Sequence, residues 1–287
     1  HSGVAVARTC AEAGLSVRVI ETMVEKNYWA YGIDFGHINS EFLRSKGVPP
    51  VDEIEFFNDW QLRSGNRSNP RLVMQFVKNC GSCFDWFLEA LSPEQRGNVQ
   101  IRYWPAPKRY SNNICGIKTW IGTEELWHDK GITEAVVASI QRAKAHGAQF
   151  HFSTVAEQLE KDGNRVTAVI AKERHGGYVR FKAAKGVVLA TGGYEFNPEK
   201  LAACCRPRDL ALGHWMNGTK TNTGDGHEMA KAIGAMEDEY PHPLMLDPEQ
   251  LMPYLRVNKR GVRFTAEYEA YNHLANAIQA QPGAYNY

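Results

Sequence analysis

The first 21 residues constrain the fold most, because a glycine-led helix is followed by one strand and an acidic residue. Residues 4–13 are small and favour a helix, and Gly14 is placed to end it. Residues 16–20 alternate as a strand, with Glu21 at its carboxyl end. Gly3, directly before the helix, would let the helix pack closely on a sheet. This order predicts an α/β fold that opens within a βαβ unit.

The spacing from Gly3 to Glu21 matches the second part of a dinucleotide-binding motif. In G-x-G-x-x-G, the third glycine allows close packing, and an acid about 20 residues later accepts hydrogen bonds from ribose hydroxyls. Gly3 fits that glycine and Glu21 fits that acid. The alternative is an ordinary helix–turn–strand segment ending in a glutamate. His1 is not a natural start, so we expect the unit's first strand to lie before it.

The later part of the chain alternates strands and helices around a small antiparallel insert. An amphipathic helix over 132–146 ends at Gly147, and a turn at 162–164 predicts a hairpin. The predicted strands cover residues 148–153, 158–161, 165–172, 178–183 and, as a buried strand, 186–190. Together they predict an α/β, Rossmann-like nucleotide-binding domain with a small antiparallel β insert. Residues 22–39 are predicted as loop, and 40–130 as irregular apart from a helix over 72–91 and a loop around 103–110.

Two glycine motifs follow this insert. VVLATGG at 187–193 ends in a glycine pair, and TGDG at 223–226 precedes a helix. Glycines let the backbone approach a ligand closely, and N–H groups at a helix N-terminus favour anionic groups. The alternatives are a plain strand-to-turn junction for the first motif and a helix capped by Asp225 for the second.

Composition excludes several classes of protein. Lys and Arg total 33 and Asp and Glu total 32, a balance that does not suggest a nucleic-acid partner. No apolar run approaches the roughly 20 residues that cross a bilayer. Cys80 and Cys83 form a lone CxxC without a second pair to complete a zinc site, so we interpret them as structural thiols, like Cys204 and Cys205.

The ordered set of motifs resembles the FAD-binding domain of the fumarate reductase/succinate dehydrogenase flavoprotein family, which includes the 3-ketosteroid dehydrogenases. The similarity covers the N-terminal segment, VVLATGG, TGDGHEMAKAIGA at 223–235 and VNKRGVRFTAE at 257–267; residues 40–130 are not aligned. The resemblance implies an FAD-binding domain over 1–238, followed at 239–287 by the start of an α+β capping domain. It also implies a fragment at both ends, without the C-terminal return that carries the family's substrate-binding Arg and His.

The same resemblance implies FAD as the cofactor and assigns residues to it. The implied FAD-binding residues are Gly3, Glu21, His37, Asn39, Val155, Ala190, Thr191, Gly192, Gly193, Gly224, Asp225 and Gly226. Val155, with Thr154, would give the backbone contact to adenine. Ala30 stands where succinate dehydrogenases carry a flavin-linking His, so we predict non-covalent FAD. His37 either faces the flavin or is an ordinary loop histidine.

Two residues are candidates for catalysis. Tyr271 follows the RF-x-x-E motif at 263–267, where fumarate reductases carry a proton-donating Arg, and 3-ketosteroid dehydrogenases have a Tyr at about this place. A phenol can move a proton once its environment is tuned; the alternative is a Tyr packed on its own helix. His242, in a Pro-His-Pro segment, resembles a His that contacts substrate in the family. Arg263 and Glu267 are predicted to fix the hinge of the cap.

The sequence therefore predicts an FAD-dependent reductase or dehydrogenase acting on a CH–CH group of an enone-like or conjugated small molecule. A monooxygenase, an amine-oxidase type of enzyme and a non-catalytic flavin-binding electron-transfer subunit remain alternatives. The electron donor is expected to be a protein or a reduced nicotinamide, with no nucleic-acid partner. The substrate's identity, the oligomeric state and the compartment, cytoplasm or export, stay open.

Overall fold

The structure is a computed structural model of residues 1–287. It describes residues 1–28, 34–104, 116–121, 131–210, 220–243, 255–267 and 271–284. The helices are α1 (Ser2–Glu12), the 3-10 turn η1 (Glu25–Asn27), α2 (Glu41–Ser45), α3 (Glu53–Arg63), α4 (Pro70–Leu88), α5 (Pro93–Gly97), α6 (Gly131–Ala145), α7 (Pro198–Cys204), α8 (Pro207–Leu210), α9 (Asp225–Ala232), α10 (Tyr271–Gln279) and the 3-10 turn η3 (Pro282–Ala284). The strands are β1 (Arg18–Ile20), β2 (Asp34–Gly36), β3 (Val99–Trp104), β4 (Gly116–Ile121), β5 (Gln149–His151), β6 (Thr154–Asp162), β7 (Arg165–Glu173) and β8 (Tyr178–Lys182).

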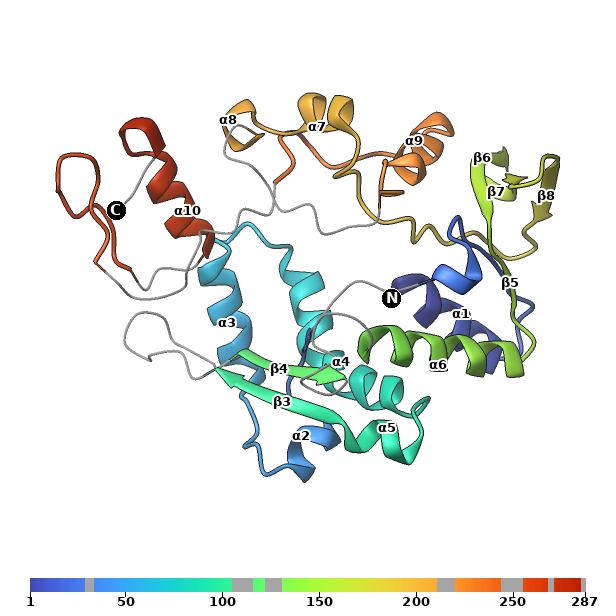
Figure 1. Ribbon diagram of the computed structural model, residues 1–287, viewed down its shortest axis with the longest axis horizontal. Coiled ribbons are helices and arrows are strands. Elements are labelled where there is room, and N and C mark those ends of the chain that lie inside the picture. Colours follow the sequence, from blue (N-terminus) through green and yellow to red (C-terminus); the bar gives the residue numbers. More distant parts are fainter. Residues whose placement is uncertain are drawn as a thin grey trace.

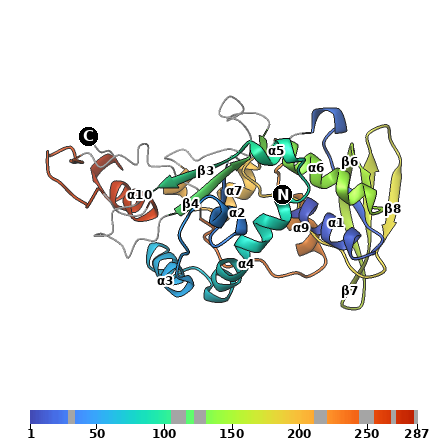
Figure 2. The ribbon, with the colours of Figure 1, turned by 90° about the horizontal axis from the view of Figure 1, so that it is seen from below.

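The described strands form three small sheets. β1 pairs in parallel with β5, β2-β4-β3 is antiparallel, and β6-β7-β8 is an antiparallel meander. The molecule is elongated, with β6–β8 at one end and α10 at the other (Figures 1 and 2). The predicted mixed α/β class and the predicted hairpin insert are confirmed.

Helix α1 packs beside α6 through small side chains. One buried cluster contains Ala11, Ala143 and Ala148. A second contains Val4, Val136 and Ile140. Methyl groups at the contact let the two helices approach closely. The predicted end glycines are confirmed, because Gly14 and Gly147 adopt positive φ angles of 78° and 93°.

A buried arginine joins α1 to α4 and α6. Arg8 is 0% exposed, lies 3.9 Å from the ring centroid of Trp86 and donates to the Trp86 carbonyl oxygen at 2.9 Å. Its Nε donates to Glu12 Oε1 at 2.9 Å, and Arg142 Nε donates to the same oxygen at 2.6 Å. A buried guanidinium is stable only with such partners, so the network fixes how the three helices meet.

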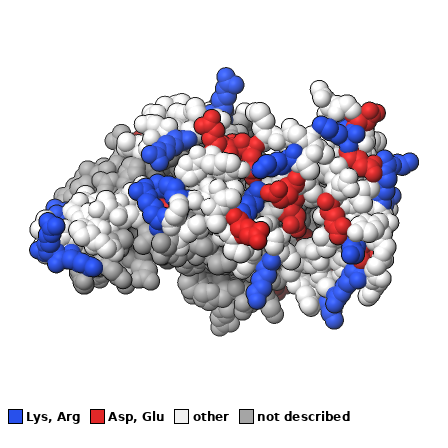
Figure 3. All heavy atoms as spheres, turned by 90° about the horizontal axis from the view of Figure 1, so that it is seen from above, with Lys and Arg blue, Asp and Glu red and all other residues white. Residues whose placement is uncertain are grey.

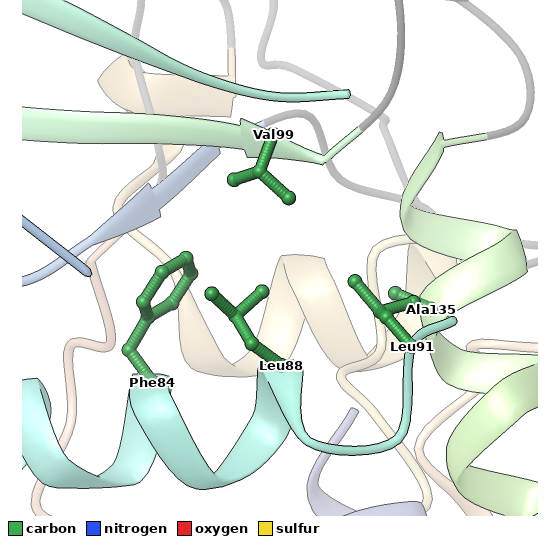
Figure 4. Close-up of a cluster of buried hydrophobic side chains, with 5 residues drawn as sticks. All are labelled: Phe84, Leu88, Leu91, Val99 and Ala135. Atoms are coloured by element: carbon green, nitrogen blue, oxygen red, sulfur yellow. The ribbon is translucent and has the colours of Figure 1, made fainter. Parts of the chain in front are cut away.

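The middle of the molecule has its own core between α4, β3 and α6. Phe84 and Leu88 project from α4 toward Val99 of β3, and Leu91 lies beside Ala135 of α6 (Figure 4). Burial of such side chains stabilises the fold by about 1.5–3 kcal/mol each.

Helix α4 crosses the loop before α2 at a glycine. A Cβ atom on Gly81 would overlap the carbonyl oxygen of Ile38 and lie 2.9 Å from backbone atoms of Asn39 and Ser40. The loop can therefore pass this close only because position 81 has no side chain.

Two sequence predictions are wrong. Residues 186–190 form no strand, and Val188 and Leu189 are 62% and 40% exposed. In the described part of the chain, β1 pairs only with β5, and no described strand lies beside residues 186–190 to accept and donate the backbone hydrogen bonds of a strand. Residues 40–130 are not largely irregular, because they contain α2, α3, α5, β3 and β4. The Asp52 side chain caps α3, accepting from the Ile54 and Glu55 amides.

The network predicts an acid-sensitive contribution from Glu12. Burial opposes its charge, but hydrogen bonds from Arg8, Arg142 and Trp86 lower its pKa to about 2. A lowered folded-state pKa gives stability that is present above the model value of 4.5 and lost as the pH falls toward 2. In Glu12→Gln, the free energy of unfolding should fall by on the order of 1 kcal/mol less than in the parent as the pH drops from 4.5 toward 2. This figure allows for solvent screening, and urea unfolding at each pH measures it. Glu25→Gln, at a 62% exposed partner of Lys144, is the control with little change; equal slopes for both variants would contradict the network.

The crossing at Gly81 gives a second prediction. Gly81→Ala should lower the free energy of unfolding by about 1–3 kcal/mol, because the added methyl meets rigid backbone. Gly97→Ala, at the end of α5 with open space around the new Cβ, should change it by less than about 0.5 kcal/mol. Urea unfolding measures both free energies. Similar values for the two variants would show that the loop at Ile38 moves away from the added methyl group at little cost.

Candidate functional site

The start of α1 lies against the first glycine motif, VVLATGG at 187–193. A Cβ atom on Gly3 would be 3.3 Å from the Cβ of Ala190. No side chain caps α1, so its first N–H groups remain a favourable end for an anionic group. The N-terminal segment and the first glycine motif, far apart in the sequence, therefore lie side by side.

Glu21 lies at the end of β1, beside the start of β6. Its amide donates to the His151 carbonyl oxygen at 2.9 Å, and its own carbonyl oxygen accepts from the Thr154 amide at 3.0 Å. Its carboxylate accepts from the Met23 amide through Oε1 at 2.8 Å. Burial and the nearby Glu21 charge raise the pKa of Tyr28 to about 12, so this phenol stays protonated. Val155, 38% exposed, follows Thr154, so the predicted ribose and adenine residues are neighbours.

The two glycine motifs form one contact. A Cβ atom on Gly226 would overlap the hydroxyl of Thr191, and one on Gly224 would lie 2.9 Å from the Cβ of Tyr194. Gly224 itself is the N-cap of α9, with a φ of 83°, so the alternative that Asp225 caps the helix is wrong. The Asp225 carboxylate instead accepts a hydrogen bond from the Thr223 hydroxyl at 2.9 Å.

Sequence analysis missed the side chains that cover the glycine pair. A Cβ on Gly192, whose φ is 75°, would be 2.7 Å from Asn222 Oδ1. A Cβ on Gly193 would be 2.7 Å from Glu195 Oε2. Their only sequence signal is adjacency, since Glu195 follows the first motif and Asn222 precedes the second.

His37 and Asn39 lie next to the α4 crossing. His37 is 2% exposed and stacked on Phe84, with ring centroids 3.8 Å apart, and burial lowers its pKa to about 4. Asn39 has a φ of 57°, and its side chain exchanges two 2.9 Å hydrogen bonds with the backbone of Val51. Both side chains serve packing here, and contact with a cofactor stays a prediction.

His242 is tied to the first glycine motif through Tyr194. Its Nδ1 lies 2.6 Å from the Tyr194 hydroxyl and its Nε2 lies 3.1 Å from the Asp238 carbonyl oxygen. The ring nitrogens are thus engaged within the protein, a geometry typical of a positioning residue. Contact with substrate stays a prediction for His242.

Tyr271 is the first residue of α10, and its side chain lies outside the described residues. Upstream, Arg263 donates to both carboxylate oxygens of Glu267 at 2.9 and 2.6 Å. The Arg263 hydrogen bonds are the main cause of a Glu267 pKa lowered to about 2. Ala30, which carries the prediction of non-covalent FAD, also lies outside the described residues.

Other classes of site receive no support from the described residues. Among them, no group of three or more His, Cys, Asp or Glu could hold a metal ion, and no helix is long and apolar enough to cross a membrane. Cys80 and Cys83 are free thiols, one buried and one exposed. On the face in Figure 3, acidic and basic side chains lie interspersed among uncharged ones.

These residues fit FAD as a cofactor. Its extended shape needs a ribose acceptor, N–H groups for the diphosphate and close-approaching backbone for the ring system. Glu21, α1 and the glycine turns are the predicted groups for these three needs, in that order; Glu21 presents a carboxylate after β1, and α1 has no side-chain cap. We call these groups the predicted cofactor edge, because they would hold FAD.

Comparison with known proteins agrees with this fit. Of curated proteins, the probable fumarate reductase Ifc3 of Shewanella frigidimarina (strain NCIMB 400) is 33% identical over 147 residues, which are 46% of this chain and 24% of that protein. The 4-oxocyclohexanecarboxylate 2-dehydrogenase of Sinomonas cyclohexanicum is 33% identical over 138 residues, 42% of this chain and 23% of that protein.

Among solved structures, the 3-ketosteroid-Δ4-(5α)-dehydrogenase from Rhodococcus jostii RHA1, in complex with 4-androstene-3,17-dione, matches with a TM-score of 0.74 and 18% identity. That match covers 97% of this chain and 62% of that one, and it shows the shared fold. The similarity to the curated relatives spans about a quarter of their length. Residues 1–286 match the family described as FAD binding domain. The chain belongs to this family of FAD-binding domains, which confirms FAD as its cofactor.

Proposed function

We propose that this chain is the FAD-holding part of an oxidoreductase that reduces, or in reverse desaturates, a C–C bond next to an electron-withdrawing group. The contact between Thr191 and Gly226 carries the proposal, because the Thr191 side chain packs on Gly226 and so holds the two glycine motifs together. The names of the two curated relatives, a fumarate reductase and a dehydrogenase of a cyclic keto acid, support this class of reaction.

The chain's residues have separate roles in this proposal. Glu21 accepts hydrogen bonds from the ribose, and the N–H groups at the start of α1 face the diphosphate. The backbone of Gly192, Gly193 and 224–226 would hold the flavin. FAD, when bound, supplies hydride exchange at its N5 atom.

Tyr271 is the proposed proton relay. It begins α10, a nine-residue helix, and a phenol can donate or accept a proton once its environment is tuned. A Tyr in place of the Arg of fumarate reductases removes a cationic partner for a small dicarboxylate. We therefore propose a larger, less charged, enone-like substrate.

The glycine contact tests the placement of the cofactor. Gly226→Ala should raise the Kd for FAD at least about tenfold, because the new methyl must push Thr191 and the adjoining turn out of place. Gly186→Ala, which meets nothing within 4 Å, should bind FAD as the parent does. Fluorescence titration with FAD measures both affinities. Equal affinities in the two variants would contradict the placement of the two glycine motifs at the cofactor.

Tyr271→Phe tests the proton relay in the complete protein. Re-oxidation of the reduced flavin by a panel of cyclic enones should slow about 10²-fold or more, with the FAD content unchanged. Tyr178→Phe, at a 64% exposed residue on β8, is the matched control and should keep the parent rate. Stopped-flow absorbance gives the rates. An undiminished rate in Tyr271→Phe removes Tyr271 from the mechanism.

A further inference from the structure

Two polar side chains pack against the Gly192–Gly193 turn. Asn222 occupies the space where a side chain on Gly192 would project, and Glu195 does the same at Gly193. The two are bonded to each other, with Asn222 Nδ2 donating to Glu195 Oε1 at 2.7 Å. A hydrogen bond to a carboxylate is roughly twice as strong as a neutral one.

This bond is not needed to join the two segments of chain. The Phe196 amide already donates to the Asn222 carbonyl oxygen at 3.1 Å, and Asn197 Nδ2 donates to the Thr223 carbonyl oxygen at 2.9 Å. What the side-chain bond adds is the fixed position of both side chains over the glycines. It therefore acts on the backbone of the turn, which has a left-handed φ at Gly192.

We propose that Glu195 and Asn222 are a positioning pair for FAD: their hydrogen bond holds the Gly192–Gly193 backbone in the conformation that meets the cofactor. The proposal rests on the cofactor role of these glycines, and it is independent of the reaction and of Tyr271. Neither side chain is a catalytic residue, since each acts through the turn.

An exchange of the two groups tests the pair. Asn222→Asp places two carboxylates at hydrogen-bonding distance, so the turn must shift or one group must take up a proton. We expect the Kd for FAD to rise at least about tenfold at neutral pH, with less loss as the pH is lowered and the carboxylates protonate. Glu195→Gln keeps an acceptor oxygen for Asn222 and should change the Kd by less than about threefold.

The double variant Glu195→Gln/Asn222→Asp decides the question. The new glutamine can donate to the new aspartate, so the bond returns with donor and acceptor exchanged. FAD affinity and the visible spectrum of the bound flavin should return to within about threefold and to the parent shape, respectively. Glu199→Gln, at an exposed residue in the first turn of α7, controls for the loss of one negative charge in Glu195→Gln alone.

Two results would overturn the proposal: parent-like FAD affinity in Asn222→Asp, or a double variant that binds FAD no better than Asn222→Asp. Thermal unfolding of each FAD-free variant separates loss of fold from loss of positioning. If Asn222→Asp unfolds, the double variant still tests the pair, because it contains a single carboxylate and its FAD affinity reports whether the exchanged bond holds the turn. Because the readout is FAD binding, an unchanged turnover in Tyr271→Phe leaves this test unaffected.

Discussion

The geometry of the cofactor edge depends on one buried charge, the guanidinium of Arg8. Its partners come from α1 itself, from α4 and, through Glu12, from Arg142 of α6. Because an unpaired buried charge would cost several kcal/mol, the three helices keep the one arrangement that satisfies it. That arrangement fixes the axis of α1, and with it the position of Gly3 against Ala190. Electrostatics in the core thus sets the geometry at the start of the site.

Close backbone approach then completes the site. Gly226 lies against the side chain of Thr191, and Gly81 lies against the backbone of the loop at Ile38; neither position has room for a side chain of its own. Sequence analysis assigned the motif glycines to cofactor contact, while the structure shows that Gly226 is already needed for contact within the protein. A glycine can serve both purposes, because its two faces are equally open. At Gly192, Asn222 occupies the space that a side chain would take.

Local signals in the sequence predicted what local forces determine. Gly14, Gly147 and the Asp162-Gly163-Asn164 turn marked element ends correctly, because each acts within a few residues. The buried strand over 186–190 was not found, since a strand depends on a neighbour that its own residues do not specify. Arg8 carried no signal at all: its partner Trp86 is 78 residues away, and in sequence it is an ordinary polar residue of a helix. Glu195 and Asn222 were missed for the same reason, as their pairing exists only once the two motifs meet.

The segment around residue 239, where the sequence predicts the start of the cap, is bound next to the Gly192–Gly193 turn. Lys200, only 7% exposed, bridges Glu228 of α9 and Glu237 at 2.7 and 3.2 Å, while Tyr194 holds His242. Tyr194 directly follows Gly193, so His242 is bonded one residue away from the glycine pair. A half-buried ion pair resists solvent screening, which makes this attachment firmer than a surface salt bridge. The Tyr194–His242 hydrogen bond therefore ties the first residues of the predicted cap to the residue next to the glycine pair, and Lys200 holds Glu237 just before them.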